Sequence, residues 1–259
     1  MKPGLNIVKV GGAVVEDAAS LAAFLNSFAD LGRASILVHG GGRRATKVAG
    51  ALGVASSMIA GRRVTSAQML DVAVMVYSGV GKQIAAGLQS RGLSAVSLCG
   101  ADLAIVRSHR RPPVEVDGLG TVDYGYVGDV DRVDSAVLSC LIGRGVVPVL
   151  APLSFDGKSL LNTNADTIAS CAAMALSSDF DVTLIYCFEH RGVLRDLSDE
   201  ASLIPHIHAA DFEDLKASGT IGCGMLPKIS NAVSAVSAGV SRVVICRFDS
   251  LGEGTIIER

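Results

Sequence analysis

The sequence predicts an α/β fold: a three-layer αβα sandwich in which helices cover both faces of a mainly parallel central sheet. Two observations predict it. Short runs rich in β-branched residues alternate with helical stretches along the chain. The chain has 259 residues, of which 49% are hydrophobic, and this is ample for the core of such a sandwich. Ligands of parallel sheets bind at the carboxyl ends of strands, so the turns after the first strands are candidate sites.

Each element follows from its local pattern. Apolar, β-branched runs predict early strands at residues 5–10, 35–39 and 94–98. Periodic apolar positions predict helices over about 17–31, from the glycine run at 40–42 to about 52, and over about 66–91. Turns with Pro and Gly separate strand-like runs at about 104–127, which predicts a hairpin excursion. The same signals predict later helices at 132–143, 164–176 and 225–238, and later strands at 146–150, 181–187 and 241–246.

Composition and charge argue against several classes of function. The chain has 23 basic and 25 acidic residues, a balance that offers no basic surface to nucleic acid or to a membrane. No apolar run approaches the ~20 residues that cross a bilayer. The N-terminal stretch MKPGLNIVKV lacks the features of a signal peptide, so we expect a cytoplasmic protein. The six cysteines include no CxxC pair, which argues against a disulfide framework and against a protein-bound metal.

The stretch LVHGGGRR, residues 37–44, places three glycines directly after a predicted strand. Such a run is costly to order, so it indicates a close approach of the backbone to another group. One interpretation is the HGGG oxyanion hole of lipases, but the required G-x-S-x-G nucleophile turn is absent from the sequence. The other is a turn whose N–H groups hold a phosphate or carboxylate. The missing nucleophile favours this second interpretation.

A second glycine-bearing stretch, GVGKQ at 79–83, does not provide a P-loop. That motif needs a glycine where the chain has Val76, and Ser or Thr where it has Gln83. The stretch also lies inside a predicted helix. We therefore interpret its glycines as small residues at a helix contact.

Three charged residues near the ends of predicted elements form the candidate catalytic group: Lys9, Asp166 and Lys228. Lysine is almost never buried without a partner, so Lys9 within an apolar strand predicts a polar cleft at the strand end. Asn164 is expected to be a helix N-cap, which puts Asp166 in the first helical turn, although capping by itself explains this segment equally well. Lys228 follows Pro227 at a predicted helix start, where a cation is disfavoured unless an anion binds nearby.

Two lysines, one aspartate and glycine-rich turns suit phosphoryl transfer, which depends on positioning and charge stabilisation. These segments contain no evident general base. A carboxylate acceptor requires none, because a glutamate-like acid with a pKa of ~4.3 is already ionised at neutral pH. The residues therefore fit a kinase that makes an acyl phosphate.

Six motifs, in this order over nearly the whole chain, resemble the amino-acid kinase family: KVGGAV, LVHGGG, GRRVT, YGYVGDV, LNTNAD and GMLPKISNAV. Within that family the resemblance is to enzymes of arginine biosynthesis that act on N-acetyl-L-glutamate. It implies ATP-dependent phosphorylation of the γ-carboxylate of an N-acylated glutamate, with Mg²⁺ carried by the nucleotide phosphates. It also implies two closely packed lobes, residues 1–177 for acyl-amino-acid binding and dimerisation and residues 178–259 for the nucleotide.

The resemblance implies a role for each site residue. Lys9 and Lys228 would stabilise the transferring phosphoryl group, and Asp166 would hold both lysines. Arg63 would pair with the α-carboxylate of the substrate, a task suited to a bidentate guanidinium, and Asn162 would contact the same end. Backbone groups of the glycine turns would contact the substrate at Gly41 and Gly42, and the phosphates at Gly11, Gly12 and Gly224.

Two places depart from the family pattern. Glu189 stands where the nucleotide lobe usually has an aspartate, and Phe188 precedes it where a small polar residue is usual. We assign Glu189 to nucleotide binding, in place of the usual aspartate. Cys223 stands where an acidic residue is usual, in a segment expected to act through its backbone.

The predicted hairpin region carries Arg107, Arg110 and Arg111, near the acyl end of the substrate in the family. A larger, acidic acyl group would need an added cation, so N-succinyl-L-glutamate is an alternative acceptor. A carbamate or aspartate kinase relative and an inactive ligand-binding sensor remain further alternatives. The chain begins eight residues before Lys9, without the N-terminal helix that interlocks the dimers of hexameric, arginine-inhibited members. We therefore expect a homodimer that is insensitive to arginine.

Overall fold

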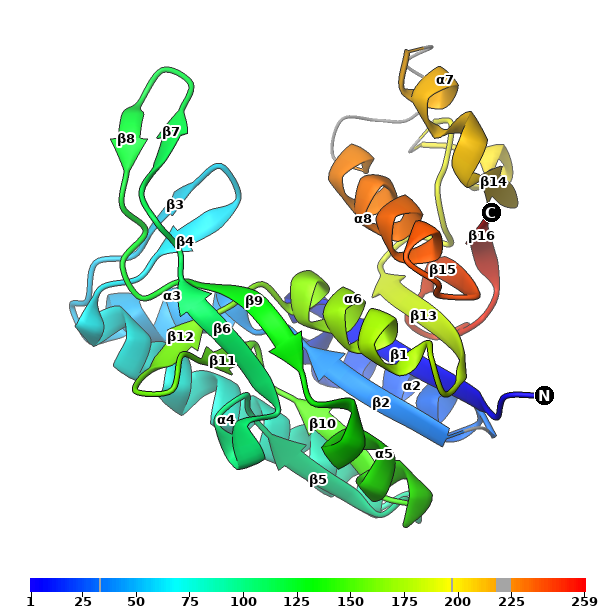
Figure 1. The fold of residues 1–259 in the computed structure, drawn as a ribbon, viewed down its shortest axis with the longest axis horizontal. Coiled ribbons are helices and arrows are strands. Elements are labelled where there is room, and N and C mark those ends of the chain that lie inside the picture. Colours follow the sequence, from blue (N-terminus) through cyan, green and yellow to red (C-terminus); the bar gives the residue numbers. More distant parts are fainter. Residues whose placement is uncertain (33, 197, 218–224) are drawn as a thin grey trace.

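A computed structural model describes residues 1–32, 34–196, 198–217 and 225–259. Its central feature is an eight-stranded sheet with the strand order β14-β16-β15-β13-β1-β2-β10-β5 (Figure 1). These strands are β1 (Gly4–Val10), β2 (Ala34–His39), β5 (Ala95–Leu98), β10 (Val147–Leu150), β13 (Asp181–Phe188), β14 (His206–His208), β15 (Arg242–Arg247) and β16 (Gly254–Glu258). β15 and β16 run antiparallel and the other neighbours run parallel, so the expected mainly parallel sheet is confirmed.

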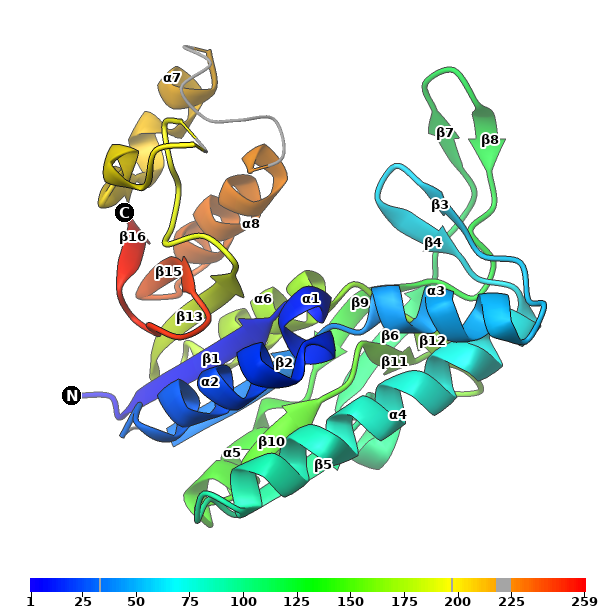
Figure 2. The same cartoon turned by 180° about the vertical axis from the view of Figure 1, so that it is seen from behind.

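Helices cover both faces of this sheet, which makes the three layers. One face carries α1 (Gly12–Glu16), α2 (Ala18–Ala29), α3 (Gly42–Ala51) and α4 (Ala67–Gln89), seen in front of the strands in Figure 2. The other face carries α5 (Ser135–Gly143), α6 (Ala165–Leu176) and α8 (Leu226–Ser237). The short α7 (Phe212–Ala217) lies beside α8. No described helix has both the length and the apolar character needed to span a membrane.

Strand β1 shows how the sequence directs side chains to the two layers. Leu5 and Ile7 lie in the core formed with α6 and α8, whereas Val8 and Val10 lie in the core formed with α3 and α4. Successive side chains of a strand point to opposite faces. Lys9 therefore shares the side of Leu5 and Ile7 and faces α6. This alternation places Lys9 against α6, the helix whose first turn carries Asp166.

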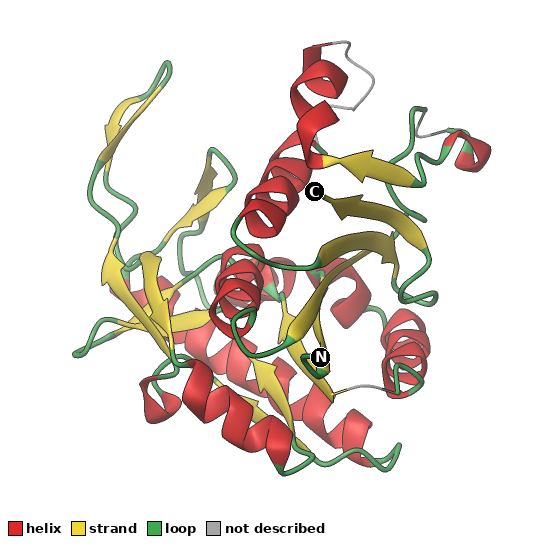
Figure 3. Cartoon of the chain, turned by 45° about the vertical axis from the view of Figure 1, so that its right-hand side comes forward, coloured by secondary structure: helices red, strands yellow, loops and turns green. Residues whose placement is uncertain are grey.

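Smaller sheets lie at the carboxyl-end side of the main sheet. A four-stranded sheet contains β6 (Val106–Arg110), β9 (Gly128–Val133), β11 (Leu153–Phe155) and β12 (Leu160–Asn162). Two hairpins, β3 (Ser57–Ile59) with β4 (Arg62–Val64) and β7 (Val114–Val116) with β8 (Gly120–Val122), project from the body. Figure 3 shows these hairpins on one side of the molecule, with α8 and the C-terminal strands on the other.

The long elements agree with the sequence expectations, and the differences have local causes. The helix expected over 17–31 is preceded by the short α1, because Asp17 ends α1 and caps α2 through Ser20. The helix expected from residue 132 begins at Ser135, because the Asp134 side chain accepts hydrogen bonds from the first-turn amides of α5. Residues 132 and 133 belong instead to β9.

Candidate active site

The glycine turns after β1 and β2 approach each other closely. Val10 and His39 are paired at the strand ends, and the Gly40 amide donates to the Val10 carbonyl at 2.9 Å. A Cβ atom at Gly40 would lie 2.9 Å from the backbone nitrogen of Gly12, closer than real Cβ atoms come. The helices α1 and α3 begin at Gly12 and Gly42 directly after these turns. The glycine run therefore lets two strand–helix turns meet at the carboxyl edge of the sheet.

The buried lysine of β1 has a partner on α6. Lys9 Nζ lies 2.8 Å from Asp166 Oδ1, and the side chains of the pair are only 11% and 20% exposed. Asn164 is the N-cap of α6: its side chain accepts from the Asp166 amide at 2.7 Å and from the Thr167 amide at 3.4 Å. The cap fixes where α6 begins and so fixes the carboxylate that meets Lys9.

Lys228 reaches the same place from the start of α8. Its ammonium lies 3.5 Å from the centroid of the Phe188 ring, and Lys9 Nζ lies 5.5 Å from that centroid. Burial lowers the pKa of Lys228, and the charge of Lys9 lowers it further, while Asp166 and Glu189 oppose the shift. Among the described residues Lys228 forms no ion pair, so the structure pairs Asp166 with Lys9 alone. That Asp166 also holds Lys228 remains a prediction.

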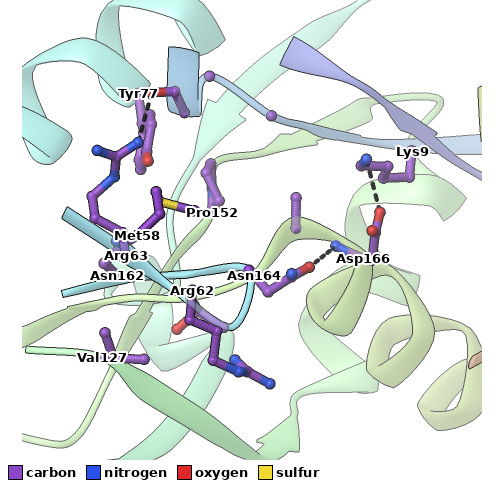
Figure 4. A pocket seen from close by; sticks show the side chains of 16 residues that line it. Lys9, Met58, Arg62, Arg63, Tyr77, Val127, Pro152, Asn162, Asn164 and Asp166 are labelled. Carbon is purple, nitrogen blue, oxygen red and sulfur yellow. Dashed lines mark hydrogen bonds and ion pairs between the residues drawn. The ribbon is translucent and has the colours of Figure 1, made fainter. Parts of the chain in front are cut away.

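A pocket of about 210 Å³ extends from these charged groups toward the β3–β4 hairpin. Figure 4 shows Lys9 and Asp166 at one end of it and Arg63 and Tyr77 at the other. Its volume lies below the roughly 300–1,000 Å³ typical of drug-sized ligands. The pocket therefore suits a molecule of amino-acid size, with a buried arginine at one end and the Lys9–Asp166 ion pair at the other.

Arg63 is buried and is held by the start of α3. Its guanidinium donates to the Gly42 carbonyl at 2.8 Å, to Thr46 Oγ1 at 2.9 Å and to Ser56 Oγ. Asn162 is also buried, at the end of β12, and its side-chain amide donates to Thr65 Oγ1 at 3.0 Å. Both residues line the pocket, as do Gly41 and Gly42. These contacts fix the orientation of both side chains, so their remaining N–H groups need little further ordering to meet a carboxylate.

Two pocket residues had no signal in the sequence. Tyr77 lies in the middle of α4 at a position typical of a core residue, and burial raises its pKa while Arg63 opposes the shift. Arg62 lines the pocket and is half-buried, and its guanidinium forms no hydrogen bond or ion pair with any described residue. Arg62 and Arg63 are consecutive residues of β4. Their side chains point to opposite faces of the strand, and only this difference separates their roles.

The basic residues of the hairpin region lie outside the pocket and have other partners. Arg111 pairs with Asp129 at 2.7 Å, and Arg110 donates to the Gly125 carbonyl at 2.7 Å. Arg107 lies 5.2 Å from the centroid of the Phe155 ring. These contacts do not support the expectation that this cluster binds a second carboxylate of the substrate.

The remaining predicted residues lie around the two lysines or outside the described chain. Gly11 and Gly12 form the turn after Lys9, and Glu189 is exposed just after β13, where its charge acts on Lys228. Gly224, like Cys223, lies outside the described residues. The described His, Cys, Asp and Glu side chains form no group of three or more that could hold a metal ion.

His39 makes stability depend on pH. Its buried Nδ1 lies 2.8 Å from the Gly40 carbonyl, which can only accept, so Nδ1 carries a proton. Burial lowers the pKa of His39 from 6.5 to about 4. The unfolded chain thus binds more protons between these values, and stability present above pH 6.5 is lost as the pH falls toward 4. The loss approaches roughly 3 kcal/mol.

We expect His39→Asn, which keeps a donor for the Gly40 carbonyl, to remove this part of the pH dependence. Urea unfolding of both proteins between pH 4.5 and 7.5 measures it. The difference in unfolding free energy between them should change across this range. A difference that stays constant would contradict the assignment.

An added methyl group should affect stability differently at Gly40 and at Gly41. At Gly41 a Cβ atom would lie 3.0 Å from the Tyr77 ring, a side chain that lines the pocket. We expect Gly41→Ala to displace that ring and raise KM for the acceptor with little loss of stability. Gly40→Ala places its methyl against backbone, so we expect it to lower stability by about 1–3 kcal/mol. Equal urea midpoints for the two variants would refute the difference.

Comparison with known proteins identifies the family of this chain. The model of the amino acid kinase family matches residues 4–247. Acetylglutamate kinase of Bacteroides fragilis is 55% identical over 247 residues, covering 95% of this chain and 92% of that protein. Acetylglutamate kinase of Bacteroides thetaiotaomicron is 52% identical over the full length of both. The crystal structure of smu.665 from Streptococcus mutans is similar with a TM-score of 0.77 at 28% identity over 98% of each chain. The chain therefore belongs to the amino acid kinase family.

Proposed function

We propose that this protein is an ATP-dependent kinase that phosphorylates the γ-carboxylate of N-acetyl-L-glutamate in arginine biosynthesis. The observation that carries the proposal is the pocket of amino-acid size with Arg63 at one end and the Lys9–Asp166 pair at the other. A dicarboxylic amino acid fits such a pocket because its α-carboxylate meets Arg63 and its γ-carboxylate lies beside Lys9. Relatives at 52% and 55% identity are named acetylglutamate kinase, which supports the acetylated acceptor.

In this reaction the chain acts by binding and by charge stabilisation. Arg63 and Asn162 hold the α-carboxylate end, which directs the γ-carboxylate toward Lys9. An oxygen of that carboxylate attacks the γ-phosphorus of ATP, the bond to the β-phosphate oxygen breaks, and ADP leaves with the electron pair. Lys9 and Lys228 stabilise the negative charge on the transferring phosphoryl group. The acceptor is already ionised, so no protein base removes a proton.

We assign the nucleotide to the side of the sheet formed by residues 178–259, with the acceptor in the part formed by residues 1–177. The turn at Gly11 and Gly12 and the segment around Gly224 would meet the phosphates, with Glu189 nearby. The charged groups at this place are two lysines and a carboxylate already paired with Lys9, a set that fits phosphate oxygens better than a bare cation. Mg²⁺ would therefore be held by the phosphates of ATP, as is usual for this ion.

An ATP-dependent hydroxamate assay tests the proposal, because hydroxylamine traps an acyl phosphate. We expect turnover with N-acetyl-L-glutamate and much less with unmodified glutamate or carbamate. N-succinyl-L-glutamate belongs in the same comparison of kcat/KM, and a preference for it would contradict the acetylated acceptor. Binding of acceptor and ATP without any hydroxamate would instead indicate a ligand-binding sensor.

The acceptor end can be tested separately. Arg63→Ala should raise KM for the acceptor by about 100-fold, since a charge-assisted bidentate contact is lost, while KM for ATP stays the same. Arg144→Ala is the matched control, because that arginine is exposed at the end of α5. An unchanged acceptor KM in the Arg63 variant would remove this residue from the substrate site.

We also propose a cytoplasmic homodimer. The edge strand β5 of the main sheet is half-buried along its length and has an unpaired side, which is a template for pairing with another copy. Light scattering after size-exclusion chromatography should give twice the 26.6 kDa of one chain. A monomeric or hexameric mass would contradict this assembly.

A further inference from the structure

We propose that Phe188 is a positioning residue for phosphoryl transfer, whose ring face holds the Lys228 ammonium at the reaction centre without neutralising it. The inference rests on the proposed function and adds to it a residue whose side chain has no polar atom. Four observations carry it: the anchoring of the ring, its contact with Lys228, the lack of a carboxylate paired with that lysine among the described residues, and the charges around it.

Phe188 is held through its backbone and through its ring. Phe188 is the last residue of β13, and its carbonyl accepts from the Phe248 amide at 3.1 Å. Its ring stacks on the buried Tyr186 ring, with centroids 6.5 Å apart and planes 26° apart. The Tyr186 hydroxyl is hydrogen-bonded to Ser170 Oγ of α6 at 2.6 Å. The helix that carries Asp166 therefore also anchors the aromatic pair.

The Lys228 ammonium lies against this ring. Its distance of 3.5 Å from the centroid is well inside the roughly 6 Å within which a ring attracts a cation. Lys9 Nζ lies 5.5 Å from the same centroid, so one ring is within reach of both ammonium groups. No described carboxylate is paired with Lys228, because the near one, Asp166, is bound to Lys9.

The charged groups around Lys228 explain why a ring suits this position. They are Lys9 on β1, Asp166 on α6 and Glu189 after β13. Burial and the charge of Lys9 lower the pKa of Lys228, so both disfavour a charged ammonium at this position before ATP arrives. A carboxylate would support the charged form but would also cancel the charge and repel phosphate. A ring face attracts the cation and adds no net charge, so the whole charge remains for the phosphoryl group.

The contact can be weakened without changing shape. Phenylalanine with one, two or three ring fluorines, incorporated at position 188, reduces the negative potential of the ring face stepwise. We expect kcat to fall with each added fluorine and to be about tenfold lower with three fluorines, while KM for the acceptor stays unchanged. The alkaline limb of kcat should move to lower pH, because the ring supports the charged form of Lys228. Phe188→Leu should behave like the trifluoro protein, and Phe188→Tyr should retain most of the activity.

The same fluorinated residues at Phe24 provide the control, since that ring is buried in the core on the other face and packs on Phe28. They should leave kcat unchanged. A kcat that is flat across the fluorine series at position 188 would overturn the inference, as would equal activity of the Phe188→Leu variant and the parent.

A second measurement does not depend on turnover. The pKa of the Lys228 ammonium can be followed by ¹⁵N NMR, with the signal assigned through Lys228→Arg. It should fall along the fluorine series if the ring supports the charge, and a constant pKa would contradict the inference. A parent protein without kinase activity would refute the proposed function, while this titration would still decide the role of the ring.

Discussion

Lys228→Ala is expected to abolish useful turnover, with kcat lower by about 10³-fold, because the variant lacks one of the two cations that stabilise the transferring phosphoryl group. The fold should remain intact. Burial already lowers the pKa of Lys228, which means that the folded protein bears a cost for this charge. Removing the charge should therefore leave the urea midpoint unchanged or slightly higher. Initial rates in the hydroxamate assay and urea unfolding measure the two effects.

Lys82→Ala is the matched control for this experiment. Lys82 also follows a glycine pair, in the GVGKQ stretch, but it is exposed on α4 and lies outside the pocket. Its replacement should leave kcat near that of the parent. Unchanged turnover in the Lys228 variant would exclude the mechanism proposed above, and equal losses in both variants would point to a nonspecific charge effect.

Asp166→Asn should lower kcat by about 10²-fold and also lower stability, in contrast to Lys228→Ala. The substitution keeps the shape of the side chain but removes the charge 2.8 Å from Lys9 Nζ. Both side chains are mostly buried, so Lys9 would be left as a poorly compensated charge. Breaking a buried pair costs about 3–5 kcal/mol, and the partial exposure here lowers the expected loss to about 1–3 kcal/mol.

A second substitution separates the two effects of Asp166→Asn. When Lys9→Met is combined with Asp166→Asn, the unpaired charge is removed. The double variant should therefore recover much of the stability and none of the activity. Urea unfolding of the four proteins of this cycle measures the recovery. Parent-like kcat in Asp166→Asn, or equal stability of the single and double variants, would contradict the proposed role of the pair.

Much of this site could be predicted from the sequence because its residues are chemically unusual where they stand. A lysine in the apolar run of β1 needs a partner, and the capping pattern around Asn164 places Asp166 in the first turn of α6. The structure brings Lys9 and Asp166 into contact. The glycine run was similarly informative, since Gly40 has no room for a side chain against Gly12.

The sequence was less informative about residues whose type and spacing are ordinary for the element in which they lie. Tyr77 has the spacing of a core residue in α4, and only the packing of α3 against α4 brings its ring beside Arg63 and the pocket. Strands of three residues, such as β3 and β11, are too short to show a clear hydrophobic pattern in the sequence, because they form only by pairing with other strands. The arginines at 107, 110 and 111 suggested a substrate contact, yet nearby carboxylates, carbonyls and rings engage them.

The sequence by itself determined the α/β class, the order of the long elements and the residue types that phosphoryl transfer to a carboxylate needs. These depend on periodicity and on local chemistry, which are properties of short segments. Only the tertiary structure decided that Asp166 pairs with Lys9, that the basic hairpin lies away from the pocket, and that Phe188 lies under Lys228. These contacts join β1, α6, β13 and α8, elements far apart in the chain. Their meeting is set by strand order and helix packing, which no local pattern specifies.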